Sequence, residues 1–321
     1  MKRLLLFLFI LFLISCDNEI RMNMDNEGLP VVYCVLDVDQ PVQYVRLAKS
    51  FFPEEDYWKE DHLSINRWDE PVDIYIEEWK NNSQPVIHAF SESDTVIQDT
   101  GYFSTPSFDL YESVFKPDTN TLYYLYLWFP EQKKYAYAST LTVCHPDIID
   151  PAPIPGREIT FSDMDDYIVQ FKTPLNSGFH PFSFTFTIEE ELPEGFRTDH
   201  FDYGGNVFEL IGNQIVVYLM NSDNFYQNLM ERYDTLSGDQ YRRIVSVEFK
   251  VRSFGKEVAI YNNLFNNGFQ PWEIQTYSSF RNGFGLFSSV SQTRMTNLEL
   301  SDLTYQTLIQ DPRYKHMKFV R

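Results

Sequence analysis

The stretch from Phe182 to Glu189 places the strongest constraint on the fold, because apolar and polar side chains alternate along it. Its apolar positions are Phe182, Phe184, Phe186 and Ile188, and its polar positions are Ser183, Thr185, Thr187 and Glu189. Successive side chains of a strand point to opposite faces, so this period of two predicts a strand with one buried face. Phenylalanine and tyrosine, which favour strands, number 28 and 21 among 321 residues. We therefore expect a mainly β protein.

Strand patterns separated by turns fill residues 30–145, where we expect a first domain. They cover Val31–Leu36, Val42–Ala48, Val72–Trp79, Gln84–Phe90, Phe108–Tyr111, Thr121–Phe129 and Tyr135–Val143. The turn residues Pro130 to Lys133 separate the last two and indicate a hairpin. Short strands at this spacing are typical of a β-sandwich.

A proline-rich stretch, residues 146–157, predicts a linker because proline cannot continue a strand ladder. Beyond it, residues 158–321 read as a second β-rich domain. Its expected strands are Glu158–Thr173, Phe182–Glu191, Val207–Met220 and Tyr241–Phe254. Its two or three expected short helices are Ser222–Tyr233, with Ser222 or Asp223 as the cap, Lys256–Phe265 and Ser301–Gln310.

The N-terminus has the layout of a bacterial lipoprotein signal. Lys2 and Arg3 precede an apolar run that is too short to span a bilayer and that ends at Ser15 and Cys16. Leu-Ile-Ser-Cys resembles a lipobox, in which the cysteine is acylated and becomes the mature N-terminus. We therefore expect residues 1–15 to be a signal peptide, Cys16 to carry the lipid, and residues 16–29 to form a flexible tether. An ordinary signal peptide with a chance cysteine is the alternative.

The formal charge of −20 argues against nucleic acid as a partner, because phosphates require a basic surface. It also argues against a polybasic grip on lipid headgroups. With Cys16 lipidated, Cys34 and Cys144 remain. We favour two free thiols, while a disulfide between them is the alternative in an oxidising compartment.

No catalytic or cofactor motif stands out from the sequence. The six histidines show no metal-ligand spacing, and no Gly-x-Ser-x-Gly elbow is present. Asp199, His200 and Asp202 lie together beside two glycines and suggest an exposed turn more than an acid–base site. Ser162–Tyr167 lacks the glycine and final glutamate of a calcium loop. We therefore expect no enzyme activity, no cofactor and no metal, although paired carboxylates for hydrolysis remain an alternative.

A loop rich in aromatic residues is the candidate contact site for a ligand or partner. Tyr57, Trp58 and Trp68, with Trp79 beyond them, could stack on sugar rings or fill a pocket of a partner. The alternative, which we favour, is that these rings cover the edge of the sandwich.

Three segments of the chain resemble a family of uncharacterised Bacteroidota lipoproteins, catalogued as a domain of unknown function. They are "LPVVYCVLDVDQPVQYVRLAKSF", "TLYYLYLWFPEQKKYAYASTLTV" with the prolines after it, and "SSFRNGFGLFSSVS". The resemblance implies a transthyretin- or immunoglobulin-like N-terminal sandwich and a second β domain, with no catalytic residues to carry over. It departs from the family pattern at Cys34, where glycine is expected.

Members of that family are often encoded beside TonB-dependent receptors. The resemblance therefore implies a lipid-anchored accessory protein at the outer membrane, where acidic residues after Cys16 fit export to the cell surface. We expect a non-enzymatic role beside such a receptor barrel in nutrient capture, with a glycan or peptide as cargo. A surface module that binds glycans or mediates adhesion is the alternative.

Overall fold

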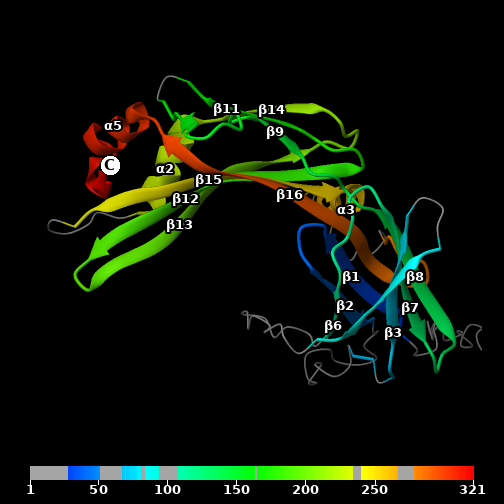
Figure 1. The fold of residues 1–321 in the computed structure, drawn as a ribbon. Coiled ribbons are helices and arrows are strands. Elements are labelled where there is room, and N and C mark those ends of the chain that lie inside the picture. Colours follow the sequence, from blue (N-terminus) through cyan, green and yellow to red (C-terminus); the bar gives the residue numbers. More distant parts are fainter. Residues whose placement is uncertain are drawn as a thin grey trace, which may run out of the picture.

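The protein is mainly β, as the sequence predicts, and is built as two lobes (Figure 1). The computed structural model describes residues 28–50, 67–68, 70–80, 84–93, 108–162, 165–233, 240–266 and 278–321. Each lobe has its own hydrophobic core of strand residues. The stretch that resembles a lipobox, with Cys16, lies outside the described residues, so lipidation remains a prediction from the sequence.

The N-terminal lobe packs two sheets face to face. One contains β1 (Pro30–Asp37), β2 (Val42–Lys49), β6 (Asp109–Val114) and β5 (Ser91–Glu92). The other has the order β4 (Val86–Ala89), β3 (Asp73–Trp79), β7 (Leu122–Phe129) and β8 (Lys134–Leu141). In β7, Tyr123, Leu125, Leu127 and Phe129 point into the core, and the residues between them point outwards.

The C-terminal lobe stacks a small sheet on a sheet of long strands. The long strands are β12 (Ser177–Leu192), β13 (Gly195–Phe208), β15 (Arg242–Gly255) and β16 (Phe284–Leu300). The small sheet has the order β14 (Ile215–Met220), β11 (Tyr167–Lys172) and β9 (Asp147–Asp150). Two short strands, β10 (Glu158–Ile159) and β17 (Phe319–Val320), pair with β16 and β15. The alternating apolar residues of β12, from Phe182 to Ile188, are buried as predicted.

The three predicted helices are present. They are α2 (Ser222–Arg232), α3 (Lys256–Asn266) and α5 (Asp302–Gln310), and a 3-10 turn follows at Lys315–Met317. The cap of α2 lies one residue earlier than expected, because the side chain of Asn221 accepts from the backbone N–H of Asn224. Ser222 instead donates its hydroxyl to the carbonyl of Asp165.

Strand β16 belongs to both lobes and makes their long sheets continuous (Figure 1). Its first half pairs parallel to β1, from Phe284 to Val290, and its second half pairs antiparallel to β15 as far as Leu298. Phe287 on this strand, and Phe280 just before it, lie in the N-terminal core. The sequence division at residue 145 assigned both rings to the second domain. The structure moves them to the first, because the inner edge of β1 needs a strand to satisfy its backbone groups.

The segment that connects the lobes, residues 143–146, runs beside β16. Hydroxyl groups at every second position of β16 form hydrogen bonds with its backbone. The hydroxyl of Ser289 accepts from the N–H of Val143 at 3.0 Å. Ser291 donates to the carbonyl of Cys144 at 2.7 Å, and Thr293 donates to that of Pro146 at 2.6 Å. The predicted linker, residues 146–157, is also partly a strand, since residues 147–150 form β9 and pair with β11. Residues 147–150 lie between Pro146 and Pro151. None of the four is proline, so each has the backbone N–H that strand pairing requires.

Candidate functional site

The outer surface of the four-stranded sheet carries an array of seven aromatic side chains. This aromatic face consists of Tyr75, Trp79, Tyr124, Tyr126, Trp128, Tyr135 and Tyr137. It arises because the inward positions of β7 and β8 are filled by core residues, so the alternate positions point away from the core. Trp79 and Tyr135 are 41% and 47% exposed, and the other five rings are partly exposed.

Strand register aligns three tyrosines in a row across the sheet. Tyr75 lies opposite Tyr126, which in turn lies opposite Tyr137. Their ring centroids are 5.2 and 6.0 Å apart, with interplanar angles of 20° and 24°. Trp128 and Tyr135 pair beside this row at 4.3 Å. Offset stacking of this kind fixes the rings before any partner arrives, which lowers the entropy cost of binding.

Charged and polar groups at the margin give the aromatic face hydrogen-bonding capacity. Arg281 lies 5.8 Å from the ring centre of Tyr137 and donates to its hydroxyl at 3.2 Å. The backbones of the same two residues exchange hydrogen bonds of 2.8 and 3.2 Å. Burial, followed by the carboxylate of Glu77 and neighbouring tyrosines, raises the pKa of Tyr126 above its usual value. Its hydroxyl therefore stays protonated at neutral pH and can donate.

The predicted contact residues separate in the structure. Trp68 is 9% exposed and packs on Phe129 with ring centroids 4.5 Å apart, while its indole N–H donates to the carbonyl of Ala48. Trp68 is therefore too buried to serve as a contact residue, and the interpretation that we favoured from the sequence, in which the ring covers the sandwich, describes it. Trp79 lies on the aromatic face, whereas Tyr57 and Trp58 fall outside the described residues.

The sequence interpretation missed the tyrosines of the aromatic face, although a signal was present. Aromatic residues occupy alternate positions at Tyr124, Tyr126 and Trp128, and again at Tyr135 and Tyr137. In both strands the positions between these aromatic residues are also apolar and fill the core. The aromatic residues themselves therefore lie on the face that points away from the core. Reading the two faces of each strand separately would have identified the array.

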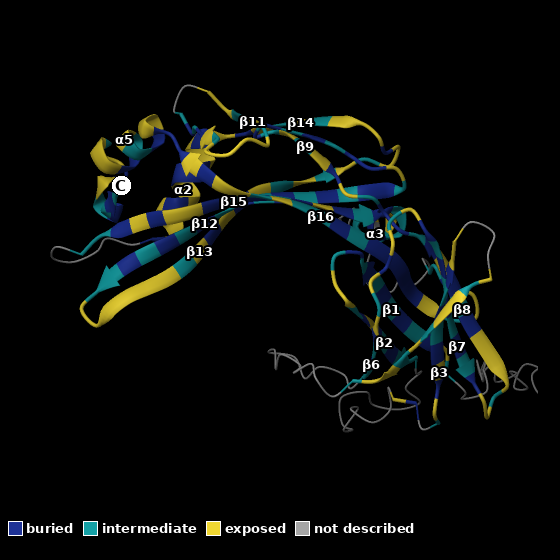
Figure 2. Cartoon of the chain, viewed as in Figure 1, coloured by how far each residue is buried: buried dark blue, intermediate teal, exposed yellow. Residues whose placement is uncertain are grey.

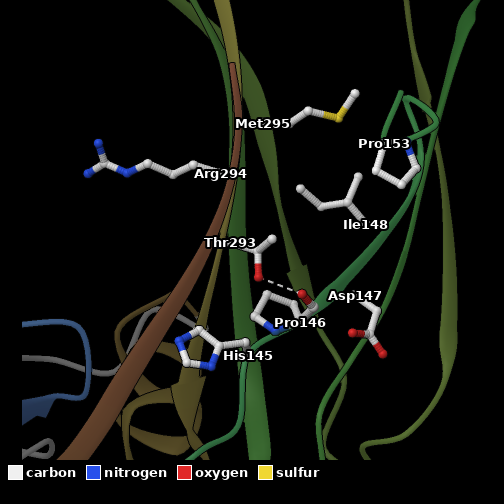
Figure 3. A pocket seen from close by; sticks show the side chains of 8 residues that line it. All are labelled: His145, Pro146, Asp147, Ile148, Pro153, Thr293, Arg294 and Met295. Carbon is white, nitrogen blue, oxygen red and sulfur yellow. Dashed lines mark hydrogen bonds between the residues drawn. The ribbon is translucent and has the colours of Figure 1, made fainter. Parts of the chain in front are cut away.

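A pocket lies where the connection enters the C-terminal lobe (Figure 3). Its volume is about 230 Å³, and its lining is His145, Pro146, Asp147, Ile148, Pro153, Thr293, Arg294 and Met295. A ring nitrogen of His145 is 2.9 Å from a carboxylate oxygen of Asp39, and the hydroxyl of Thr293 donates a hydrogen bond to the carbonyl of Pro146. These polar groups secure the connection, so the pocket is weaker than the aromatic face as a binding site.

The other sequence candidates have structural partners. Asp199, His200 and Asp202 lie on β13 and not in a turn, so the expectation of a turn there is wrong. The carboxylate of Asp199 accepts from Arg232 and from the hydroxyl of Tyr233, and the bond from Arg232 holds the pKa of Asp199 well below its usual range. Among the described residues, no group of three or more His, Cys, Asp or Glu side chains could hold a metal.

Both described cysteines are free thiols, so the disulfide alternative is not formed. Cys34 is buried in the N-terminal core, and burial raises the pKa of its thiol far above the usual value. Cys144 is partly exposed on the connection between the lobes. Within the described part of the chain, no helix has the length and apolar character needed to span a membrane.

Comparison with known proteins gives neither a family nor an activity. No family model matches the chain, and no curated protein matches it. Among solved structures, it is similar to the calcium-binding domain CBD12 of CALX1.2 at 10% identity, over 82% of this chain and 99% of that one, with a TM-score of 0.19. The secreted serine protease VesC from Vibrio cholerae matches at 7% identity, over 62% and 48%, also with a TM-score of 0.19. Similarities with TM-scores this low carry no argument about the fold or the function of this chain.

Proposed function

We propose that this chain is a lipid-anchored, non-enzymatic accessory protein of the outer membrane that binds its partner through the aromatic face. The observation that supports binding is the half-exposed array of tyrosine and tryptophan rings with Arg281 at its margin. Tyrosine, tryptophan and arginine are the residues enriched at binding hot spots. They offer a large, stiff contact area together with hydrogen bonds.

The proposed place of action rests on the N-terminus and on the family resemblance. A lipid on Cys16 would hold the chain at the outer membrane, and the tether up to residue 29 would leave both lobes free to reach a neighbouring protein. The proposed partner is a TonB-dependent receptor barrel, and the proposed task is nutrient capture. Acidic residues after Cys16 favour display at the cell surface.

Gentle detergent extraction followed by affinity purification of the full chain tests this proposal. We expect a barrel protein to co-purify with the wild type and to be lost with the double variant Trp128→Ala/Tyr135→Ala, which removes one tilted ring pair. Tyr44→Ala is the matched control, because Tyr44 is 39% exposed on β2, away from the aromatic face. Recovery of the wild-type chain without any barrel protein would contradict the proposal.

A glycan-binding module is the second candidate function, and the tyrosine row favours it. Sugar rings present C–H groups that pack on aromatic faces and hydroxyls that bond to tyrosine, so neutral glycans match this surface. Affinity electrophoresis in gels containing neutral polysaccharides separates the two functions. Retardation of the wild type and of Tyr44→Ala, but not of the double variant, would favour the glycan module. No retardation of any variant would exclude these polysaccharides as ligands.

A further inference from the structure

The sheet of long strands in the C-terminal lobe has an outer face that the described residues leave partly exposed. Its inner face lies in the core, where Phe182 of β12 packs near Phe171 of the small sheet with ring centroids 5.9 Å apart. Side chains alternate along a strand, so Ser183 and the residues at every second position from it point to the outer face. Figure 1 shows this face turned towards the side on which the N-terminal lobe projects, and Figure 2 shows much of β13 exposed along it.

Three cations form a basic patch on this outer face. Lys250 of β15 lies directly opposite Arg294 of β16, and Arg252 follows two positions along β15 on the same face. Figure 3 shows the side chain of Arg294 pointing away from Thr293 and Met295, which line the pocket on the other side of β16. Cross-strand neighbours have Cβ atoms about 4.5–5.5 Å apart, and like charges placed directly opposite destabilise a sheet. The basic patch therefore carries a cost in repulsion.

The described residues compensate this repulsion only in part. Glu248 lies 3.8 Å from Arg294, whereas Lys250 and Arg252 form no ion pair within the described part of the chain. This arrangement runs against the composition, since the chain has 26 lysines and arginines against 46 aspartates and glutamates. Cations gathered on one surface attract an anion from solution. An external anion is thus the complement that the basic patch lacks.

Hydrogen-bonding side chains flank the basic patch on the neighbouring strands. Ser183 of β12 lies opposite Lys250, and Gln292 of β16 lies opposite Arg252. The Ser183 hydroxyl and the Gln292 amide can each donate and accept hydrogen bonds. The outer face therefore offers charge for an acidic group and neutral partners for hydroxyl groups.

A row of three phenylalanine rings adjoins the basic patch. Phe254, two positions beyond Arg252 on β15, lies opposite Phe179, which in turn lies opposite Phe208. The ring centroids are 5.6 and 4.8 Å apart, and Phe208 is 45% exposed. Aromatic faces pack against the C–H groups of a sugar ring. Charge, hydrogen-bonding groups and an aromatic surface are thus adjacent on one sheet face.

We propose that this outer face binds a short acidic oligosaccharide, with Lys250, Arg252 and Arg294 holding its carboxylate or sulfate groups. The formal charge of −20 opposes a long polyanion, but salt screens charge beyond about 8 Å, so the adjacent cations determine the binding of a short one. A flat lipid surface fits less well, because the N-terminal lobe projects on the side that the patch faces (Figure 1). This site is separate from the aromatic face and does not depend on what that face binds.

Isothermal titration calorimetry of the full chain in detergent tests the proposal. The probes are tetragalacturonate, which carries carboxylates, a carrageenan tetrasaccharide, which carries sulfates, and neutral maltotetraose. We expect at least one acidic tetrasaccharide to bind more tightly than maltotetraose, with an affinity that falls as salt is added. Lys250→Gln/Arg252→Gln should weaken that binding at least about tenfold, because it removes two charged donors. Lys250→Arg/Arg252→Lys keeps both charges and should retain most of the affinity.

Two double variants serve as controls. Arg243→Gln/Arg313→Gln removes the same charge from exposed positions outside the basic patch, and Trp128→Ala/Tyr135→Ala alters the aromatic face. Both should bind the acidic tetrasaccharide like the wild type. Failure of both acidic probes to bind at millimolar concentration, equal binding of maltotetraose, or the same loss in either control would overturn the proposal. Binding to phosphatidylglycerol vesicles without binding to either acidic probe would also overturn it, in favour of a lipid surface.

Discussion

Replacing Phe287 with alanine tests whether β16 stabilises the N-terminal lobe. Phe287 is completely buried in that core, although it lies far beyond the proline-rich connection in the sequence. Truncating a buried phenylalanine removes its packing and leaves a cavity, which costs about 3–5 kcal/mol. Since each 1.4 kcal/mol is a factor of ten, protected amides of β1 and β7 should exchange at least about a hundredfold faster.

Hydrogen exchange with mass spectrometry resolves this effect by segment. Phe249→Ala is the matched control, because Phe249 is equally buried in the C-terminal core on β15. We expect Phe249→Ala to accelerate exchange mainly in β12 and β15, and Phe287→Ala mainly in β1 and β7. Unchanged protection of β7 in Phe287→Ala, with faster exchange in β12, would refute the assignment of Phe287 to the N-terminal core.

Three further predictions concern ionisable side chains. Burial lowers the pKa of His180 to about 4, so the folded state resists protonation of this ring. The free energy of unfolding should therefore fall by about 3 kcal/mol as the pH drops from 7 to 4. Urea titrations of His180→Gln should show that this part of the pH dependence is lost. Arg242→Met leaves the carboxylate of Glu190 buried without its main partner and should cost about 3–5 kcal/mol in the same titrations. Cys34 should react with iodoacetamide only after unfolding, whereas Cys144 reacts in the native state, as peptide mapping would show.

The sequence predicted the individual strands and helices better than it predicted which strands pair with each other. The period of two from Phe182 to Ile188 and the three helices depend on neighbouring residues, so local patterns reveal them. The pairing of β1 with β16 joins residues more than 250 positions apart, and no local pattern encodes it. The domain division therefore missed the strand that both lobes share.

The candidate site shows the same limit. Trp68 was a candidate because it lies in a charged loop rich in aromatic residues, yet its ring packs in the core against Phe129. The residue type predicts a large buried area but does not say against which surface that area is buried. Tyr126 was overlooked because its strand reads as uniformly apolar until its two faces are separated. Which face is covered depends on the packing of the second sheet, which is a tertiary property.

The shared strand also connects the candidate site to the C-terminal lobe. Arg281 and Asn282 lie just before β16, and they bind the aromatic face by hydrogen bonds to Tyr137 and to the carbonyl of Tyr135. The same strand holds the connection between the lobes through the hydroxyl of Ser289 and then pairs with β15 in the sheet of the C-terminal lobe. Residues 30–145 alone would lack both the strand that pairs with β1 and the guanidinium at the aromatic margin. The aromatic face therefore depends on the whole chain, because the segment that leads into β16 supplies Arg281 and Asn282 at its margin.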